Sequence, residues 1–203
     1  MNTKVLLTED KVDLNPFVQF KNWFQEREGS GTDVPNSVSL GTSSIEGEVS
    51  VRTVLLKDYN ETGFVFFSNY LSKKGRQMEN NPRAALLFYW PESGRQVRIE
   101  GKVYMVSSEE SDFYFNTRPE ESRISAWASE QSSVIPDRQY LETRFGFYRN
   151  KFLHGSIERP PHWGGYRLIP SWFEFWQSGQ HRLHDRICYT LTNGKWVINR
   201  LAP

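Results

Sequence analysis

The residues best suited to chemistry lie in one stretch of the sequence, from Trp163 to Arg186. Its middle carries four aromatic side chains in a short alternating run, Trp172, Phe173, Phe175 and Trp176. Behind them, after Gly179, come His181, Arg182, His184, Asp185 and Arg186. A purely structural segment needs the aromatic side chains but has no use for so many charged and titratable groups directly behind them. We therefore predict that this junction is part of a site.

A metal centre is a poor interpretation of this stretch. His181 and His184 are three residues apart, but arginines lie between and behind them, and guanidinium cations repel a divalent ion. The chain also has no glycine-rich dinucleotide loop after a strand, no P-loop, no H-E-x-x-H and no G-x-S-x-G elbow. We predict no metal site and no hydrolytic triad.

Other cations stand at the ends of predicted elements. Arg52 and Lys57 leave one predicted strand on opposite faces, because successive side chains of a strand alternate. They either lie at exposed edges or bind two anions in different pockets. Lys73 and Lys74 fall in the first turn of a short helix capped by Ser72, where cations oppose the helix dipole unless an anion lies among them. A solvated basic turn and a phosphate site both fit this pattern.

A second anion site is suggested by Tyr114, Arg118 and Ser122. They are spaced at four-residue intervals, which would align them on one helix face, but Pro119 interrupts the helix. We therefore expect them to converge at a helix end. A phenol, a guanidinium and a hydroxyl that meet there can bind a phosphate group.

Composition limits the classes of function. A chain of 203 residues is long enough for one domain with a sizeable core. The net charge is only +1, so no global basic field recruits nucleic acid or an anionic membrane, and neither is an expected partner. Aromatic residues make up 15% of the chain, which suits a protein that stacks on a planar ligand or buries a large interface. Composition does not choose between those two uses.

The lone cysteine, Cys188, excludes an intrachain disulfide and a cysteine-based zinc site and favours a reducing compartment. It lies in an alternating apolar run, where a packed small residue is the more frequent role than a reactive thiol. The first ten residues lack the apolar core of a signal peptide, and no apolar run approaches the roughly 20 residues of a membrane span. We expect a cytoplasmic protein.

The elements that must position these residues are mostly strands. Residues 1–14 are polar and aperiodic, and we expect a flexible tail. A helix then begins at Asn15-Pro16, and its stripe of Phe17, Phe20, Trp23 and Phe24 is expected to face the core. From residue 37 the apolar period changes to two, with a turn at Glu46-Gly47 that predicts a hairpin.

Further strands are predicted at 64–69, 83–90 and 95–106, the second of them central because it is almost continuously apolar. Helices follow from the capping box at Ser107, after Pro119, and up to about Leu153, and we expect the last of these to pack on the sheet. Strands return at the end, with a two-residue turn at Asn193-Gly194. This order predicts a mainly β fold with α-helices at its flanks, in which an antiparallel barrel-like sheet forms a single domain over residues 15–203.

Cations at strand and helix ends, combined with Trp, Gln and Tyr side chains, suit a flat heteroaromatic ligand that carries a phosphate. Flavin mononucleotide (FMN) fits this description, since it has one phosphate, a polyol and a planar ring whose reactivity is tuned by nearby hydrogen bonds and charge.

The motifs also carry a family resemblance. In order along about residues 15–203 they are R-T-V-L-L-K, R-Q-V-R-I-E-G, Y-F-N-T-R-P-x-x-S, Q-S-S-x-I-P, W-G-G-Y, E-F-W-Q-x-G, H-R-L-H-D-R and N-R-L-A-P. Together they resemble the pyridoxamine 5'-phosphate oxidases. The resemblance implies an FMN-binding split-barrel homodimer with FMN at the subunit interface. It also implies oxidation of pyridoxine or pyridoxamine 5'-phosphate to pyridoxal 5'-phosphate, with O2 as the electron acceptor and hydrogen peroxide as the product.

The resemblance further implies roles for individual residues. The FMN contacts would be Arg52, Thr53, Val54, Leu55, Leu56, Lys57, Phe67, Ser68, Lys73, Lys74, Gln96, Gln131, Ser132, Trp176 and Arg186. The substrate would be bound by Lys57, Tyr114, Arg118, Ser122, Arg182 and His184, of which Arg182 and His184 would lie over its ring as the catalytic pair. Lys73 departs from the arginine usual in relatives, which keeps the charge but loses the bidentate fork.

Two alternatives remain beside this hypothesis. One is a related split-barrel flavin reductase with another substrate, which the loss of Tyr114, Arg118 and Ser122 would have favoured, although all three are present. The other is a non-catalytic module that binds FMN or pyridoxal phosphate, which binding without turnover would support.

Overall fold

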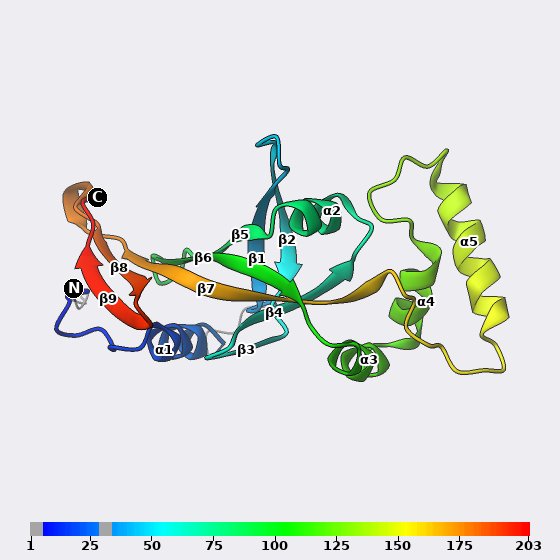
Figure 1. Ribbon diagram of the computed structural model, residues 1–203, viewed down its shortest axis with the longest axis horizontal. Coiled ribbons are helices and arrows are strands. Elements are labelled where there is room, and N and C mark those ends of the chain that lie inside the picture. The colour runs from blue at the N-terminus through cyan, green and yellow to red at the C-terminus, as the bar shows by residue number, and fades with distance from the viewer. Residues whose placement is uncertain (1–5, 29–33) are drawn as a thin grey trace.

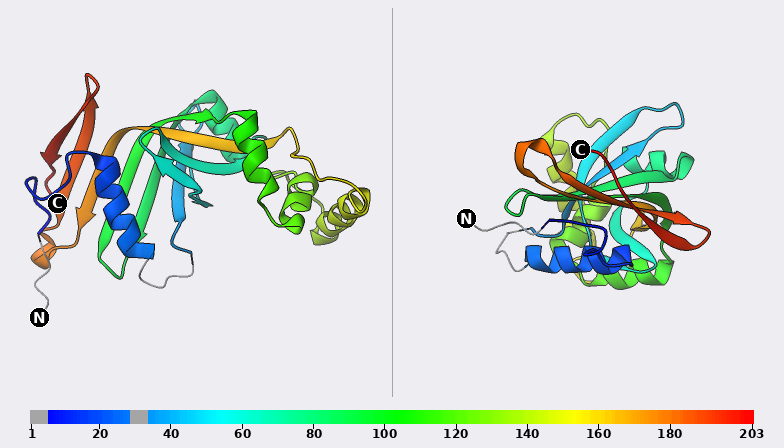
Figure 2. Two further views of the ribbon diagram at one scale, coloured as in Figure 1. Left: turned by 90° about the horizontal axis from the view of Figure 1, so that it is seen from below. Right: turned by 90° about the vertical axis from the view of Figure 1, so that its left-hand side faces the viewer.

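One curled antiparallel sheet organises the molecule. The computed structural model describes residues 6–28 and 34–203 (Figure 1). In these ranges nine strands form a sheet in the order β2-β1-β5-β6-β7-β4-β3, with β8 paired to β7 and β9 to β8. The strands are β1 Ser37–Ser43, β2 Val49–Leu55, β3 Asp58–Asn60, β4 Gly63–Asn69, β5 Arg83–Trp90, β6 Arg95–Met105, β7 Trp163–Gln177, β8 Asp185–Thr192 and β9 Lys195–Arg200. The sheet curls into half of a barrel, which confirms the predicted mainly β architecture (Figure 2).

The helices lie at the flanks of this sheet. They are α1 Pro16–Glu28, α2 Lys73–Asn80, α3 Ser108–Asn116, α4 Glu120–Ala128 and α5 Arg138–Lys151, with a short 3-10 turn at Gln180–Arg182. The predicted caps are confirmed, because the Ser72 hydroxyl accepts a hydrogen bond from the Gly75 amide and the Ser107 hydroxyl accepts one from the Glu110 amide. Pro119 separates α3 from α4, as its missing N–H and fixed φ predict.

The core lies between α1 and the sheet. The Asn15 side-chain oxygen accepts a hydrogen bond from the Phe17 amide at 2.9 Å, which fixes the start of α1. The ring of Phe20 lies 5.0 Å from that of Phe88 on β5, and the ring of Trp23 lies 5.3 Å from that of Phe175 on β7. The predicted aromatic stripe of α1 therefore lies in the core. The opposite face of β6, β7 and β8 is not covered by α1.

The long strand β7 connects the two ends of the molecule. Its first half pairs with β4 and its second half with β8, while β6 runs along its other edge. The β6–β7 register shifts between Glu100 and Gly101, where Ser171 has no partner. Such a bulge bends the strand locally, and it allows β7 to leave one side of the barrel and reach the other.

We expect Gly101→Ala to lower the free energy of unfolding by about 1–3 kcal/mol, because its Cβ would collide with the backbone carbonyl of Ile169 at this bulge. Urea denaturation of the purified protein measures the effect. Gly41→Ala is the matched strand control, since the nearest atom to its new Cβ is 3.8 Å away. Equal losses in the two variants would contradict the argument.

Two sequence expectations about the flanks need correction. The predicted tail is anchored where the structure describes it, since Leu7 and Val12 are buried and the Leu7 amide donates to Asp185 Oδ2 at 3.1 Å. Arg200 also donates to Glu9 Oε1 at 3.0 Å. Residues 1–5 of the predicted tail lie outside the described residues. The partners lie almost two hundred residues along the chain, so local periodicity could not reveal them.

Helix α5 packs against α4 and not on the sheet, at the far end of the molecule (Figure 1). Its Phe145, Tyr148 and Phe152 join a small cluster with Phe115 and Ile124, separate from the main core. The apolar face was predicted correctly, but its partner was not, because an amphipathic pattern does not say what covers it.

Candidate functional site

A cavity of about 490 Å³ opens between β2, β4, the α3–α4 junction and the loop after α4. It is lined by residues from segments that are far apart in the sequence: Thr53, Val54, Leu55, Lys57, Phe67, Ser68, Asn69, Lys74, Tyr114, Thr117, Arg118, Pro119, Ser122, Gln131 and Trp163. Most of them are predicted site residues. Asn69, Thr117, Pro119 and Trp163 were not predicted as site residues, although Trp163 begins the stretch that the sequence singles out.

One end of the cavity is cationic. The Lys74 ammonium donates to Gln131 Oε1 at 2.8 Å and to Ser72 Oγ at 3.2 Å, and Lys74 is only 9% exposed. Nearby, Arg52 donates to Thr42 Oγ1 at 2.6 Å and to the Leu40 carbonyl at 3.1 Å. Burial, and then the charge of Arg52, lower the pKa of Lys74 to about 8.

Neither Arg52 nor Lys74 forms an ion pair with a carboxylate within the described ranges. Two partly buried cations that repel each other and have no counter-charge are unfavourable until an anion lies between them. Hydroxyl and amide groups of Ser68 and Gln131 stand beside them, with Ser68 Oγ 3.3 Å from Gln131 Oε1. This end is therefore a candidate phosphate site.

A second cation stands at the α3–α4 junction. Arg118 lies with its guanidinium carbon 4.5 Å from the centre of the Trp163 ring, and its Nη1 is buried without a hydrogen-bond partner among the described residues. Burial lowers the pKa of Arg118. Tyr114 and Ser122 line the same cavity, so the structure brings the three residues together as their spacing predicts. A buried guanidinium nitrogen without a partner is costly unless a ligand oxygen accepts a hydrogen bond from it.

The walls between the two cationic points are aromatic. Phe67 stacks on Tyr114 with 4.0 Å between ring centres, and on Trp163 with 5.5 Å. Lys57 Nζ lies 5.8 Å from the centre of the Tyr114 ring. The cavity can thus accept a planar ligand and two anionic groups.

A second group of predicted site residues forms a row across three strands. Gln96 on β6 pairs with Trp176 on β7, which pairs with Arg186 on β8. Directly paired residues point to the same face of a sheet, so the three side chains stand side by side on the face away from α1. Arg186 donates to Glu174 Oε1 at 2.6 Å and to the Ala202 carbonyl at 2.7 Å. The hydrogen bond to Glu174 raises the pKa of Arg186.

The loop before β8 carries Arg182 and His184. His181 and Arg182 have φ angles of 54° and 64°, so the chain turns sharply through a left-handed conformation there. The Gly179 amide donates to His184 Nδ1 at 3.2 Å, which leaves the proton of a neutral imidazole on Nε2. The His184 ring lies 4.7 Å from that of Trp176. The loop therefore belongs to the Gln96–Trp176–Arg186 row.

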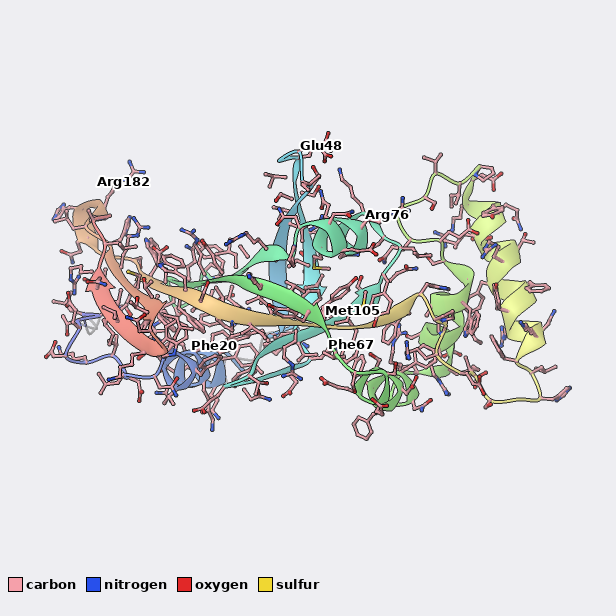
Figure 3. The ribbon with its side chains drawn as sticks, in the orientation of Figure 1. Phe20, Glu48, Phe67, Arg76, Met105 and Arg182 are labelled. Carbon is pink, nitrogen blue, oxygen red and sulfur yellow. The ribbon has the colours of Figure 1, made fainter. Side chains whose placement is uncertain are left out.

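The structure does not bring this second group to the cavity. Figure 3 shows Phe67 near the middle of the molecule and Arg182 pointing outward at one end. Of the other predicted residues, Lys73 and Ser132 line a separate hollow of about 370 Å³ beside α2, and the Leu56 side chain is part of the core. In one copy of the chain the predicted site residues therefore form two separate groups.

Two further properties concern the described residues alone. Their His, Cys, Asp and Glu side chains nowhere form a group of three or more that could hold a metal ion. Their helices include none that is long and apolar enough to cross a membrane.

The sequence matches models and members of one protein family along almost the whole chain. The family model for pyridoxamine 5'-phosphate oxidase matches residues 32–150, and that for the pyridoxine 5'-phosphate oxidase C-terminal dimerisation region matches residues 163–203. A curated pyridoxine/pyridoxamine 5'-phosphate oxidase from Nostoc sp. is 51% identical over 198 residues, which is 97% of this chain and 92% of the relative. One from Crocosphaera subtropica is 52% identical over 200 residues, with 97% and 94% covered.

Solved structures give the same fold. PhzG from Burkholderia lata, in complex with tetrahydrophenazine-1-carboxylic acid, superposes with a TM-score of 0.91 at 29% identity over 98% of both chains. A pyridoxamine 5'-phosphate oxidase-related, FMN binding protein from Nostoc punctiforme has a TM-score of 0.72 at 18% identity, over 95% of this chain and 100% of its own. These neighbours confirm the predicted split-barrel architecture.

Proposed function

Since this chain belongs to the pyridoxamine 5'-phosphate oxidase family, we propose that it oxidises pyridoxamine or pyridoxine 5'-phosphate to pyridoxal 5'-phosphate. The observation that carries the proposal is one cavity with two separate cationic points and aromatic walls. One point is Lys74, with Arg52 close to it, and the other is Arg118, whose buried Nη1 has no hydrogen-bond partner among the described residues. Two phosphates, one on a cofactor and one on a substrate, would satisfy both.

The residues of the cationic end fit FMN as the cofactor. Arg52, Lys74, Ser68 and Gln131 offer charge and hydrogen bonds to a single phosphate, while Phe67 and residues 53–55 of β2 line the space beside it. The chemistry that bound FMN supplies is acceptance of a hydride equivalent from the substrate, and passage of the two electrons to O2 with release of hydrogen peroxide. The protein contributes binding, orientation and charge.

At the other end, Arg118, Lys57, Tyr114 and Ser122 would bind the substrate phosphate. These contacts with the phosphate would hold the substrate ring with its reacting carbon toward the flavin. Such positioning accelerates a reaction without a strong acid or base. Arg182 and His184 would lie over the ring, where His184 can donate a hydrogen bond from Nε2 because Nδ1 is occupied by the Gly179 amide.

A second copy of the chain would complete the site. Residues 163–203 match a dimerisation region, and the sheet exposes apolar side chains such as Val49 and Val51, at 75% and 68%. A hollow of about 580 Å³ lies next to them between β1, β5, β6 and β7. We propose a homodimer in which the partner copy supplies Gln96, Trp176, Arg182, His184 and Arg186 to the cavity.

The affinity for FMN should depend on pH through Lys74. The cation binds phosphate, and the pKa of Lys74 is about 8, so affinity is full below pH 8 and falls as the pH rises through that value. Between pH 7 and pH 9 we expect a loss of about tenfold, measured by quenching of flavin fluorescence. Lys74→Met should bind weakly at pH 7 and lose this slope, whereas the exposed, remote Lys21→Met should keep it. A slope that persists in Lys74→Met would contradict this assignment.

The likeness to PhzG supports a second candidate, an oxidase of a multi-ring carboxylic acid. The two candidates differ in the anion that Arg118 would bind, a phosphate or a carboxylate. Curated relatives that are about half identical over 97% of the chain favour the phosphorylated substrate.

One experiment tests the proposal against a non-catalytic binding module and a flavin reductase. The purified protein should be yellow after incubation with FMN and should release hydrogen peroxide when pyridoxamine or pyridoxine 5'-phosphate is added. Dephosphorylated pyridoxamine is the matched control and should react poorly. Protein that stays colourless after reconstitution would refute the proposal, flavin binding without turnover would support a binding module, and turnover with nicotinamide donors alone would support a flavin reductase.

A further inference from the structure

A buried carboxylate lies beside the row formed by Gln96, Trp176 and Arg186. Glu174, on β7, is only 1% exposed, yet it belongs to the sheet face that carries Trp176. Each of its two carboxylate oxygens accepts a hydrogen bond from an arginine. Oε1 accepts from Arg186 Nε at 2.6 Å, and Oε2 accepts from Arg98 Nη1 at 3.0 Å. In register, Glu174 stands between Arg98 on β6 and Cys188 on β8, one row from Gln96, Trp176 and Arg186.

Stability alone does not account for this arrangement. A buried ion pair can often be replaced by apolar side chains without loss of stability, because desolvation of the charges offsets their attraction. Here the Glu174 carboxylate faces two guanidinium groups, and the second of them, Arg98, is also paired with Glu100, so the four charges balance. A geometric role is the more economical explanation.

The contacts of Arg186 indicate what that role is. Its Nε is bound to Glu174 and its Nη1 to the Ala202 carbonyl, so the plane of the guanidinium group is fixed at two points. Within the described chain, Nη2 has no hydrogen-bond partner. A planar guanidinium group held in this way presents its remaining nitrogen in one direction with little entropy left to lose.

We propose that Glu174 is a positioning residue that orients Arg186 so that Nη2 is presented to the flavin. The inference rests on the proposed function, since it takes the cofactor of that site to be FMN. Glu174 itself would not touch the cofactor, and Arg98 would hold the other oxygen of the carboxylate in place.

A double-mutant cycle on FMN affinity tests the proposal. If Glu174 acts through Arg186, Glu174→Gln and Arg186→Gln should each raise the Kd of FMN by about tenfold, and the double variant should be no weaker than Arg186→Gln alone. Glu100→Gln is the matched control, since Glu100 also pairs with Arg98 but does not contact Arg186. Its Kd should stay near that of the unmodified protein. Additive losses, or unchanged affinity in Glu174→Gln, would overturn the proposal.

The reduction potential of bound FMN separates positioning from simple electrostatics. If Arg186 leaves its place in Glu174→Gln, the flavin loses a nearby cation and its potential should fall. If Arg186 stays, the flavin loses only a nearby anion and its potential should rise, which would overturn the proposal. Should Glu174→Gln fail to fold, Arg186→Lys serves instead, because it keeps the charge but lacks Nη2. Wild-type affinity in Arg186→Lys would refute the idea.

Failure of this inference is distinguishable from failure of the proposed function. Unmodified protein that binds no FMN refutes the function itself. Unmodified protein that binds FMN and releases peroxide, together with a Glu174→Gln variant of equal affinity, refutes only the role of Glu174.

Discussion

Replacing Arg118 with alanine raises the KM for pyridoxamine 5'-phosphate by about 10- to 100-fold and leaves kcat within a few-fold. The range corresponds to the loss of one charge-assisted hydrogen bond of about 1.5–3 kcal/mol. Arg118 is stacked on Trp163 and has a buried nitrogen that no described residue accepts from, so the substrate phosphate would be its partner. Such a contact exists equally in the ground state and the transition state, and its loss therefore affects KM.

Steady-state peroxide release at a series of substrate concentrations measures this effect. Arg138→Ala is the matched control, because Arg138 is exposed on α5 and pairs only with Glu142 among the described residues. Its kinetic constants should not change. A variant at Arg118 with normal KM and a much lower kcat would show that this residue acts on the reacting centre instead.

The opposite pattern is expected for Arg182→Ala, in which kcat falls by about 100-fold while KM changes little. Arg182 would lie over the substrate ring and align its reacting carbon, and misalignment of reacting atoms costs rates of this order. Its side chain forms no ion pair with a described residue and points away from its own subunit, as a group aimed at a neighbouring subunit would (Figure 3).

His181→Asn is the matched control for Arg182→Ala. It changes the adjacent exposed side chain, and asparagine tolerates the left-handed backbone that His181 adopts. Single-turnover reduction of the flavin, followed by its absorbance, separates the chemical step from product release. An Arg182→Ala variant that reduces the flavin at the normal rate would contradict the assigned role.

Mixing the two variants tests whether the site is shared between subunits. If each site takes Arg118 from one copy and Arg182 from the other, a mixed dimer of the two variants has one intact site and one site that lacks both residues. Co-expression should then restore about a quarter of the unmodified activity, since about half of the dimers are mixed. No restoration would show that each site is built from a single copy.

Local chemistry made much of the fold predictable from the sequence. Ser72 and Ser107 cap helices, Pro119 ends one, and Asn193-Gly194 turns a hairpin with positive φ angles of 52° and 74°. Each of these features depends on a few neighbouring residues. The convergence of Tyr114, Arg118 and Ser122 was predictable for the same reason, because a single proline determines it.

The features that escaped prediction depend on distant partners. The apolar face of α5 was visible in the sequence, but nothing local said that α4 covers it. Glu174 appeared as one polar residue in an aromatic strand, and only the pairing of three strands reveals that it holds two arginines. The two groups of predicted site residues lie far apart in one copy of the chain, and local sequence patterns do not give the distance between elements that are remote in the sequence.

The anchored segment at residues 6–14 has a consequence for the order in which the protein forms during synthesis. Arg200 holds Glu9 across a separation of 191 residues, and Leu7 binds Asp185 across 178. Contacts so remote along the chain cannot form until Asp185 and Arg200 have been synthesised, whereas the hairpins and capped helices that precede them can fold as they emerge. The loop with Arg182 and His184, which precedes Asp185 directly, therefore acquires this support after the hairpins and capped helices upstream of it have formed. A chain that stops before Arg200 would therefore carry the cavity lined by Lys74 and Arg118 but not the contact between Arg200 and Glu9.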